Sequence, residues 1–340
     1  MKTHRWAQVG LILGGAALAG LAWAAFRRRN ADWLTRKTVF ITGGARGLGL
    51  VLARKIGDAG ARVAICSRNV QQLERARDEL QQRNIVVWPL ECDVTDGDAV
   101  KRMLGQIESR WGVPDIVINN AGVIQMGPLE SLTEADFVTA METHFWAPLC
   151  VMREVIPGMR ARGSGQIVNI ASIGGKISPP HLVAYNSSKF ALVGLSEGFA
   201  AELAKDGIRV TTICPGLMRT GSPRNALFKG RHREEYSWFS ILGSLPGLSM
   251  SAEHAADKIL SAMRQGKAVS ILGLPAKLAT LMHDLLPELT ISGLAAANRF
   301  LPGIGGIGQA SARGVESQSM LSPSLLTTLT EQAAVQNNEL

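Results

Sequence analysis

Apolar runs rich in β-branched residues alternate with amphipathic stretches along the middle of the chain. The runs have the length of buried strands and lie at residues 38–42, 62–67, 86–91, 116–119, 166–170, 209–214 and 269–272. Helical periodicity marks the stretches at residues 48–59, 70–83, 97–111, 133–162, 184–205 and 251–265. Continuous apolar strands that alternate with helices are typical of a parallel sheet covered on both faces. The pattern therefore predicts one α/β domain at residues 35–275, with a doubly wound sheet of about seven strands.

Three segments depart from this alternation. Residues 219–250 form a long insertion, basic at first and then apolar, which we expect to be a lid over a substrate pocket. Residues 276–302 carry a one-sided apolar stripe, which predicts an amphipathic helical extension on a membrane or on protein. Residues 303–340 are rich in Gly, Ser, Gln and Asn with little periodicity, so we expect a mostly disordered tail.

The first part of the chain contains 18 residues without a charge, Val9 to Phe26. At 1.5 Å per residue a helix over this segment is about 27 Å long, close to the thickness of a bilayer core. Arginines at 27–29 follow directly, whereas Lys2 and Arg5 are the only cations before it. Because the heavier positive flank stays cytoplasmic, residues 1–34 predict a single-pass membrane anchor with the main domain in the cytoplasm.

Two other interpretations of the segment stay open. The triplet at residues 22–24, Ala-Trp-Ala, resembles a signal-peptidase site, although an arginine triplet so close behind it argues against export. A buried helix of a soluble domain would have a similar composition. Gly10 and Gly14 form a GxxxG pair, which is compatible with a homo-oligomer.

Charge and cysteine content exclude some functions. The formal net charge is +8, which suits an anionic cofactor or an anionic membrane surface. No Lys/Arg run is interleaved with aromatic residues, so we predict no nucleic-acid partner. The four cysteines form no CxxC pair, so we predict no metal site and reduced, buried thiols: Cys66, Cys92, Cys150 and Cys214.

A glycine-rich turn joins the first predicted strand to the first predicted helix. It reads Thr-Gly-Gly-Ala-Arg-Gly-Leu-Gly, with Gly43, Gly47, Leu48 and Gly49 as candidate cofactor-binding residues. Glycines there allow the backbone to approach a pyrophosphate, which the free N–H groups of the helix N-terminus bind. Such a turn can also be purely structural.

The residue after the second strand indicates which nucleotide binds. An NAD site needs an acidic residue about 20 positions after the glycines, to hold the ribose 2′-hydroxyl. Arg68 stands there instead, 19 residues after Gly49, and Arg46 lies within the glycine turn. Unless they are ordinary surface arginines, both suit the 2′-phosphate of NADP(H). Asp93, after the third strand, is a candidate for the adenine amine or a simple turn residue.

Tyr185 and Lys189 carry the chemistry that the sequence indicates most strongly. Four residues apart on a helix, they share a face, where a lysine cation would lower the pKa of the phenol from about 10 toward neutrality. Tyr185 would then donate a proton to a carbonyl or accept one from an alcohol. Ser172, 13 residues upstream, is placed to hydrogen-bond the reacting oxygen.

These features occur together and in order, and from Thr38 to Leu272 the chain resembles the short-chain dehydrogenase/reductase family, which has a Rossmann-type fold. The resemblance implies that Asn120, Ala121 and Gly122 support the central strand and flank the cofactor. It also implies that Lys189 holds the nicotinamide ribose, and that the nicotinamide is bordered by Pro215, Gly216 and Thr220.

One position departs from the family pattern. The family usually has an Asn on the long helix after the Asn-Asn-Ala-Gly segment, where the main-chain carbonyl is thought to hold a water. His144 stands there, either as a catalytic proton relay or as a core residue without a chemical role.

The sequence thus predicts an NADP(H)-dependent oxidoreductase that interconverts a carbonyl and an alcohol by hydride transfer. An anchor, an apolar lid and an apolar stripe suit a lipophilic small molecule, such as a steroid, a retinoid or a long-chain ketone. The alternative is a catalytically degenerate, membrane-anchored NADP-binding protein with a regulatory or scaffolding role. The complete Ser172/Tyr185/Lys189 set argues against it.

Overall fold

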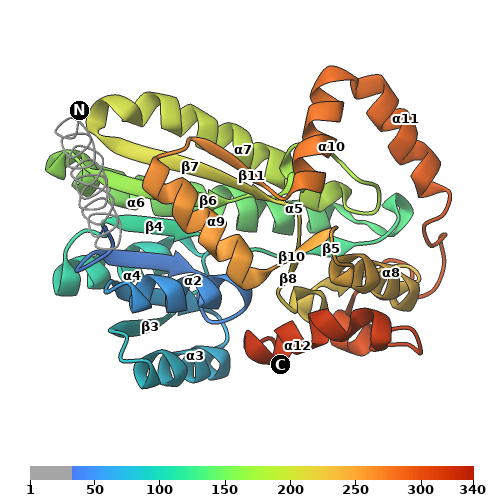
Figure 1. Ribbon diagram of the computed structural model, residues 1–340, viewed down its shortest axis with the longest axis horizontal. Coiled ribbons are helices and arrows are strands. Elements are labelled where there is room, and N and C mark those ends of the chain that lie inside the picture. Colours follow the sequence, from blue (N-terminus) through green and yellow to red (C-terminus); the bar gives the residue numbers. More distant parts are fainter. Residues whose placement is uncertain (1–32) are drawn as a thin grey trace, which may run out of the picture.

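The computed structural model describes residues 33–340 and centres on one parallel sheet with the strand order β11-β7-β6-β4-β1-β2-β3 (Figure 1). Its strands are β1 (Thr38–Thr42), β2 (Arg62–Ser67), β3 (Val87–Glu91), β4 (Ile116–Asn119), β6 (Gly165–Ile170), β7 (Ile208–Pro215) and β11 (Val269–Leu272). The predicted doubly wound, Rossmann-type α/β fold is confirmed. The order reverses between β1 and β4, which is where such sheets bind ligands.

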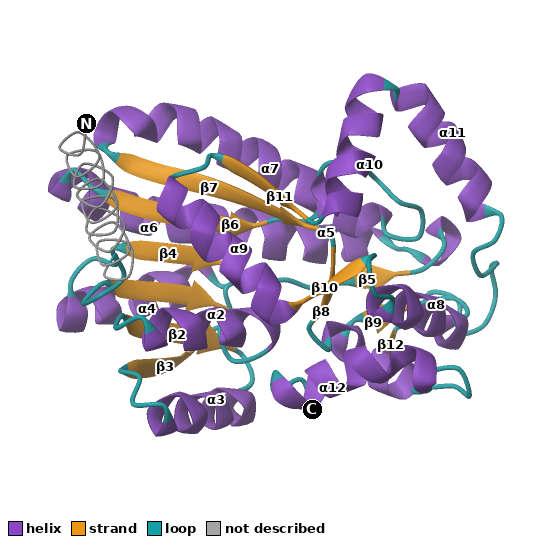
Figure 2. Ribbon diagram, in the orientation of Figure 1, coloured by secondary structure: helices purple, strands orange, loops and turns teal. Residues whose placement is uncertain are grey.

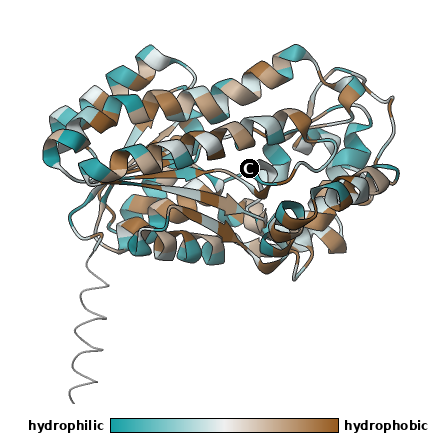
Figure 3. Ribbon diagram, turned by 90° about the horizontal axis from the view of Figure 1, so that it is seen from above, coloured by the Kyte–Doolittle hydropathy of each residue, from teal (hydrophilic) through white to brown (hydrophobic). Residues whose placement is uncertain are grey.

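Helices cover both faces of the sheet, as Figure 2 shows. One layer consists of α2 (Gly47–Asp58), α3 (Val70–Gln82) and α9 (Ala252–Gln265), and the other of α4 (Gly97–Trp111), α6 (Ala147–Arg162) and α7 (Val183–Leu203). Val39 and Ile41 pack in the first layer's core and Phe40 in the second, because successive strand side chains alternate between faces. In Figure 3 the apolar strands run between the two helix layers.

The predicted helix at 133–162 is not continuous. It consists of α5 (Glu134–Met141), a π-helical turn η2 (Glu142–Trp146) and α6. The extra residue of a π-turn re-aims the side chains next to it, and such turns are frequent at functional sites. His144 lies in this turn.

The insertion at 219–250 contains β9 (Leu227–Phe228), α8 (His232–Ser244) and, at its end, β10 (Ser249–Ser251), which pairs with β8 (Leu217–Arg219). The extension at 276–302 contains most of α10 (Leu274–Leu285) and all of α11 (Pro287–Asn298), which lie at one corner of the molecule (Figure 1). Their large side chains are mostly exposed: Leu278, Leu281, Met282, Leu285, Leu286 and Leu289.

The tail differs from the sequence-based expectation of disorder. β12 (Ala312–Arg313) pairs with β9, which also pairs with β5 (Gln125–Met126), so the tail completes a three-stranded sheet. It then forms α12 (Thr328–Gln336), which packs beside α8. The polar tail is held by hydrogen bonds to distant parts of the chain, which periodicity does not reveal.

The predicted anchor at Val9–Phe26 lies outside the described residues. Within residues 33–340 no helix is both long and apolar enough to cross a bilayer. All four cysteines are free, and three are buried while Cys150 is half-buried, which agrees with the predicted reduced thiols.

Candidate active site

The glycine turn lies between β1 and α2, at the carboxyl edge of the sheet. Gly43 and Gly47 have φ of 64° and 55°, the left-handed region that favours glycine. A Cβ on Gly49 would lie 2.2 Å from the Gly43 carbonyl oxygen, so this position has no room for a side chain. Asn120 Nδ2 donates to the carbonyls of Thr42 and Gly43, each 3.1 Å away. The turn is thus braced by the residue that follows β4.

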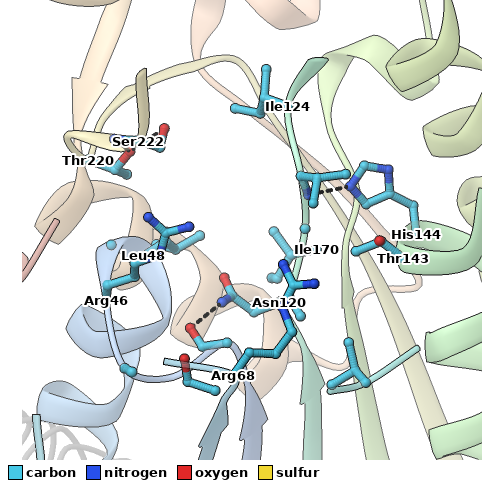
Figure 4. A pocket seen from close by; sticks show the side chains of 18 of the residues that line it. Arg46, Leu48, Arg68, Asn120, Ile124, Thr143, His144, Ile170, Thr220 and Ser222 are labelled. Atoms are coloured by element: carbon cyan, nitrogen blue, oxygen red, sulfur yellow. Dashed lines mark hydrogen bonds between the residues drawn. The ribbon is translucent and has the colours of Figure 1, made fainter. Parts of the chain in front are cut away.

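Both candidate phosphate-binding arginines reach the same cavity, Arg46 from the turn and Arg68 from the end of β2 (Figure 4). Arg68 Nη1 lies 3.3 Å from Asp93 Oδ2. Partial burial would raise the pKa of Asp93, but hydrogen bonds from Thr95 and the nearby Arg68 outweigh it and lower this pKa below its usual value. Asp93 is therefore an anion beside the Arg68 cation.

Ser172, Tyr185 and Lys189 meet across the ends of β6 and α7. Ser172 Oγ accepts a hydrogen bond from the Gly174 N–H at 3.0 Å, and the Tyr185 ring lies against the same glycine. Lys189 Nζ donates to the Ile170 carbonyl at 2.9 Å and lies 5.7 Å from the centre of the Tyr185 ring. The predicted constellation is therefore assembled.

The glycine turn, the two arginines, Tyr185 and Lys189 line one cavity of about 240 Å³. Its wall includes most of the predicted site residues: Gly43, Arg46, Gly47, Leu48, Arg68, Asp93, Asn120, Ala121, Gly122, His144, Tyr185, Lys189 and Thr220. Gly49, Ser172, Pro215 and Gly216 are not among the residues that line it. Sequence reasoning missed Glu339, a nearly fully buried carboxylate near the C-terminus that also lines the cavity.

Comparisons with known proteins show the family of the chain. A family model described as short chain dehydrogenase matches residues 37–227. The chain belongs to the short-chain dehydrogenase family. Dehydrogenase/reductase SDR family member 7B of Xenopus tropicalis is 30% identical over 303 residues, covering 87% of this chain and 96% of that protein.

Solved structures of the short-chain dehydrogenase family share the fold. One from Streptomyces avermitilis has a TM-score of 0.67 and 29% identity, covering 78% of this chain and 97% of that one. L-sorbose reductase from Gluconobacter frateurii, complexed with NADPH and L-sorbose, has a TM-score of 0.62 and 25% identity, with coverages of 70% and 95%. This short-chain dehydrogenase is accordingly an oxidoreductase acting on CH–OH or C=O groups.

In this short-chain dehydrogenase, burial shifts the pKa values of Tyr185 and Lys189 in opposite directions. It lowers the pKa of Lys189 to about 7. It raises the pKa of Tyr185 above 10, and the neighbouring Ser172 hydroxyl only partly opposes the rise. The predicted lowering of the phenol pKa by Lys189 is therefore wrong for the protein alone, because desolvation penalises the tyrosinate and the ammonium separately.

His144 is a buried, neutral residue in this dehydrogenase. Its Nε2 accepts from the Val123 N–H at 3.1 Å, so Nδ1 carries the proton and donates to Ser188 Oγ at 2.7 Å. Burial and the nearby Lys189 lower the pKa of His144 well below 6.5. Both ring nitrogens are engaged in hydrogen bonds, and the imidazole stays neutral near neutral pH. His144 therefore has a positioning role, and the predicted proton relay is not supported.

Proposed function

We propose that this short-chain dehydrogenase reversibly transfers hydride between NADP(H) and a lipophilic carbonyl or alcohol. One observation carries the proposal: Tyr185, Lys189, the glycine turn and both arginines face a single cavity, and Ser172 lies beside Tyr185 at Gly174. A phenol, an amine and a hydroxyl gathered beside the nucleotide turn have no use in a protein that only binds nucleotide.

The residues present fit a phosphorylated dinucleotide. The turn is too tight for side chains at Gly43 and Gly49, which leaves its backbone open to a pyrophosphate. Arg68 is largely exposed at the end of β2, where an NAD site would have an acid. Two guanidinium groups on the adenine side favour the 2′-phosphate. The likeness to a reductase crystallised with NADPH supports the same choice.

Three side chains handle the proton. NADPH, when bound, supplies the hydride to the carbonyl carbon. Tyr185 gives its phenolic proton to the carbonyl oxygen as the C–O double bond becomes a single bond, and Lys189 in its charged form stabilises the tyrosinate. The Ser172 hydroxyl donates to the same oxygen and orients it. Alcohol oxidation reverses each transfer.

A lipophilic substrate is supported by the apolar surroundings of the cavity. Ile124 lies in the cavity wall and joins an apolar cluster with Trp238 and Phe239 of α8, the helix of the insertion. These side chains are only partly buried, so apolar surface is left for a ligand to cover.

The test is a turnover screen with NADPH and NADH against a ketosteroid, retinal, a 3-ketoacyl lipid and a small aldehyde. We expect NADPH oxidation with at least one lipophilic carbonyl and none by Tyr185→Phe. Preference for small aldehydes or sugars would contradict the substrate class, and preference for NADH would contradict the cofactor.

We also propose that Val9–Phe26 anchors the protein with its catalytic domain in the cytoplasm, on the charge asymmetry of its flanks. The full-length protein should sediment with membranes and resist carbonate extraction. Deletion of residues 1–30 should release it with activity on detergent-dispersed substrate retained. Full-length protein in the soluble fraction would refute the anchor.

A further inference from the structure

The C-terminal tail is held against the catalytic domain by α12. Ala334 of α12 packs on Gly221, where a Cβ would lie 2.3 Å from the Ala334 Cα. Arg224 Nη1 also pairs with Glu331 Oε2 at 3.0 Å. The helix therefore delivers the last four residues, 337–340, to the edge of the cavity.

These four residues contact the glycine turn directly. The Gly47 N–H donates to the Asn337 carbonyl at 2.8 Å. Asn338 Nδ2 donates to the Ala45 carbonyl at 2.8 Å, and Arg46 Nη1 pairs with Glu339 Oε2 at 2.7 Å. The Asn337 carbonyl therefore already accepts the hydrogen bond of the Gly47 N–H, and the Glu339 carboxylate already pairs with the Arg46 guanidinium.

These are the groups that a dinucleotide phosphate needs. The N–H at the start of α2 is an anion-binding donor, and Arg46 is a cation for the phosphate oxygens. Glu339 also takes the space, since a Cβ on Gly47 would lie 2.6 Å from Glu339 Oε1. The carboxylate lies where the close approach of a pyrophosphate to the turn is expected.

We propose that residues 337–340 are a built-in competitor for the phosphate groups of the cofactor, with Glu339 as the competing anion. The inference rests on the proposed NADP(H) function. Cofactor binding then requires the tail to leave the turn, which makes tail release a point of regulation. Any partner that captures the free C-terminus would raise the affinity for cofactor.

Polar contacts hold residues 337–340 in place. Glu339 is 5% exposed, and Asn225 Nδ2 donates to its Oε2 at 2.7 Å. Arg75 donates to the Asn338 side chain and to the Leu340 carbonyl. These polar contacts can be exchanged for water, and burying a carboxylate costs free energy, so displacement by a dianionic phosphate is feasible.

The experiment measures the Kd of NADPH and of NADH by calorimetry for the full-length protein and three variants. We expect a chain that ends at Gln336 to bind both nucleotides about tenfold more tightly. Glu339→Gln should tighten NADPH about threefold and NADH less, because Arg46 is freed for the 2′-phosphate. Glu316→Gln, an exposed tail carboxylate outside the cavity wall, is the control and should bind like the parent protein.

Unchanged Kd values in both the shortened chain and Glu339→Gln would overturn the competition, while leaving NADP(H) binding by the parent protein intact. Weaker binding in either variant would show that the tail is part of the cofactor site and would overturn it too. If no variant binds either nucleotide, the proposed cofactor itself fails.

Hydrogen exchange on the unmodified protein is a second, independent measurement. The Asn337 and Glu339 amides donate to the carbonyls of Ala333 and Ala334. Saturating NADPH should speed exchange of the peptide that contains residues 337–340. Slower exchange with NADPH would mean that the tail closes over the cofactor and would overturn the proposal.

Discussion

His144 Nδ1 and Ser188 Oγ lie 2.7 Å apart, and this hydrogen bond joins the π-helical turn to the helix that carries Tyr185. The Ser188 hydroxyl in turn donates a hydrogen bond to the Tyr185 main-chain carbonyl at 2.7 Å. The His144 ring also meets the Tyr185 ring edge-on, with centres 5.4 Å apart. A histidine that replaces the usual asparagine therefore sets where the catalytic tyrosine stands.

Replacing His144 should affect position and stability rather than proton transfer. We expect His144→Asn to keep kcat within about tenfold and to lower Tm by several degrees, because the smaller side chain leaves a cavity. Its pH profile of kcat/KM should overlay that of the parent protein around neutral pH, since burial and Lys189 lower the pKa of His144 and keep the imidazole neutral there. A limb near pH 6–7 that disappears in His144→Asn would show instead that the ring titrates in catalysis.

Tyr185→Phe removes the proton donor while keeping the ring. We expect kcat to fall at least about 100-fold and the Kd of NADPH to change less than about threefold. Turnover kinetics with a carbonyl substrate that the parent protein reduces would measure kcat. Fluorescence titration would measure the Kd of NADPH. Near-normal turnover would mean that another group supplies the proton.

Arg68→Asp should move cofactor preference toward NADH. Loss of one charged contact to the 2′-phosphate is worth about 1.5–3 kcal/mol, and the new acid would both repel the phosphate and accept from a ribose hydroxyl. The ratio of kcat/KM for NADPH to that for NADH measures the effect. Arg77→Asp, a similar exchange on the outer face of α3, is the control. Equal ratios in the parent protein and Arg68→Asp would contradict the role of Arg68.

Burial of Lys189 predicts a stability difference that depends on pH. The pKa is about 7 in the fold and about 10.4 in the unfolded chain, so between these values the unfolded chain binds more protons. The unfavourable contribution of the buried ammonium is therefore full below pH 7 and fades as pH rises toward 10.

Lys189→Met should consequently be more stable than the parent protein at pH 6, by at least about 3 °C in Tm, with the gap narrowing toward pH 10. Lys205→Met, on the exposed turn η4 (Ala204–Asp206), is the control. A gap that is constant with pH would mean that Lys189 has the same pKa in the folded and unfolded chains.

Two glycines in helices should respond to alanine in opposite ways. Gly49→Ala would push a methyl group into the Gly43 carbonyl, so we expect lower Tm and NADPH binding weakened at least about tenfold. Gly105 of α4 has nothing within 4 Å of its would-be Cβ. Gly105→Ala should therefore raise the free energy of unfolding by about 0.5–1 kcal/mol and leave the Kd of NADPH unchanged. Similar outcomes for both would refute the steric argument.

Periodicity and local motifs were sufficient for the strands and helices that build the sheet, for the glycine turn and for the spacing of Ser172, Tyr185 and Lys189, because each of these signals lies within a short stretch of sequence. The π-turn at 142–146 was missed, since one extra residue shifts the helical phase too little to be seen in the pattern. The docking of Glu339 was also missed. Its partner Arg46 is 293 residues away, and no local signal marks a pairing of that separation.

The 293 residues between Arg46 and Glu339 also mean that the two are synthesised at different times. Chains fold from the N-terminus as they are made, at roughly 5–20 residues per second, so the segment with the glycine turn and the catalytic helix is complete before the last residues emerge. β12 and α12 join the fold only after that segment. For seconds the nascent enzyme would carry an uncovered anion site, and cofactor present in the cell would meet it before Glu339 does.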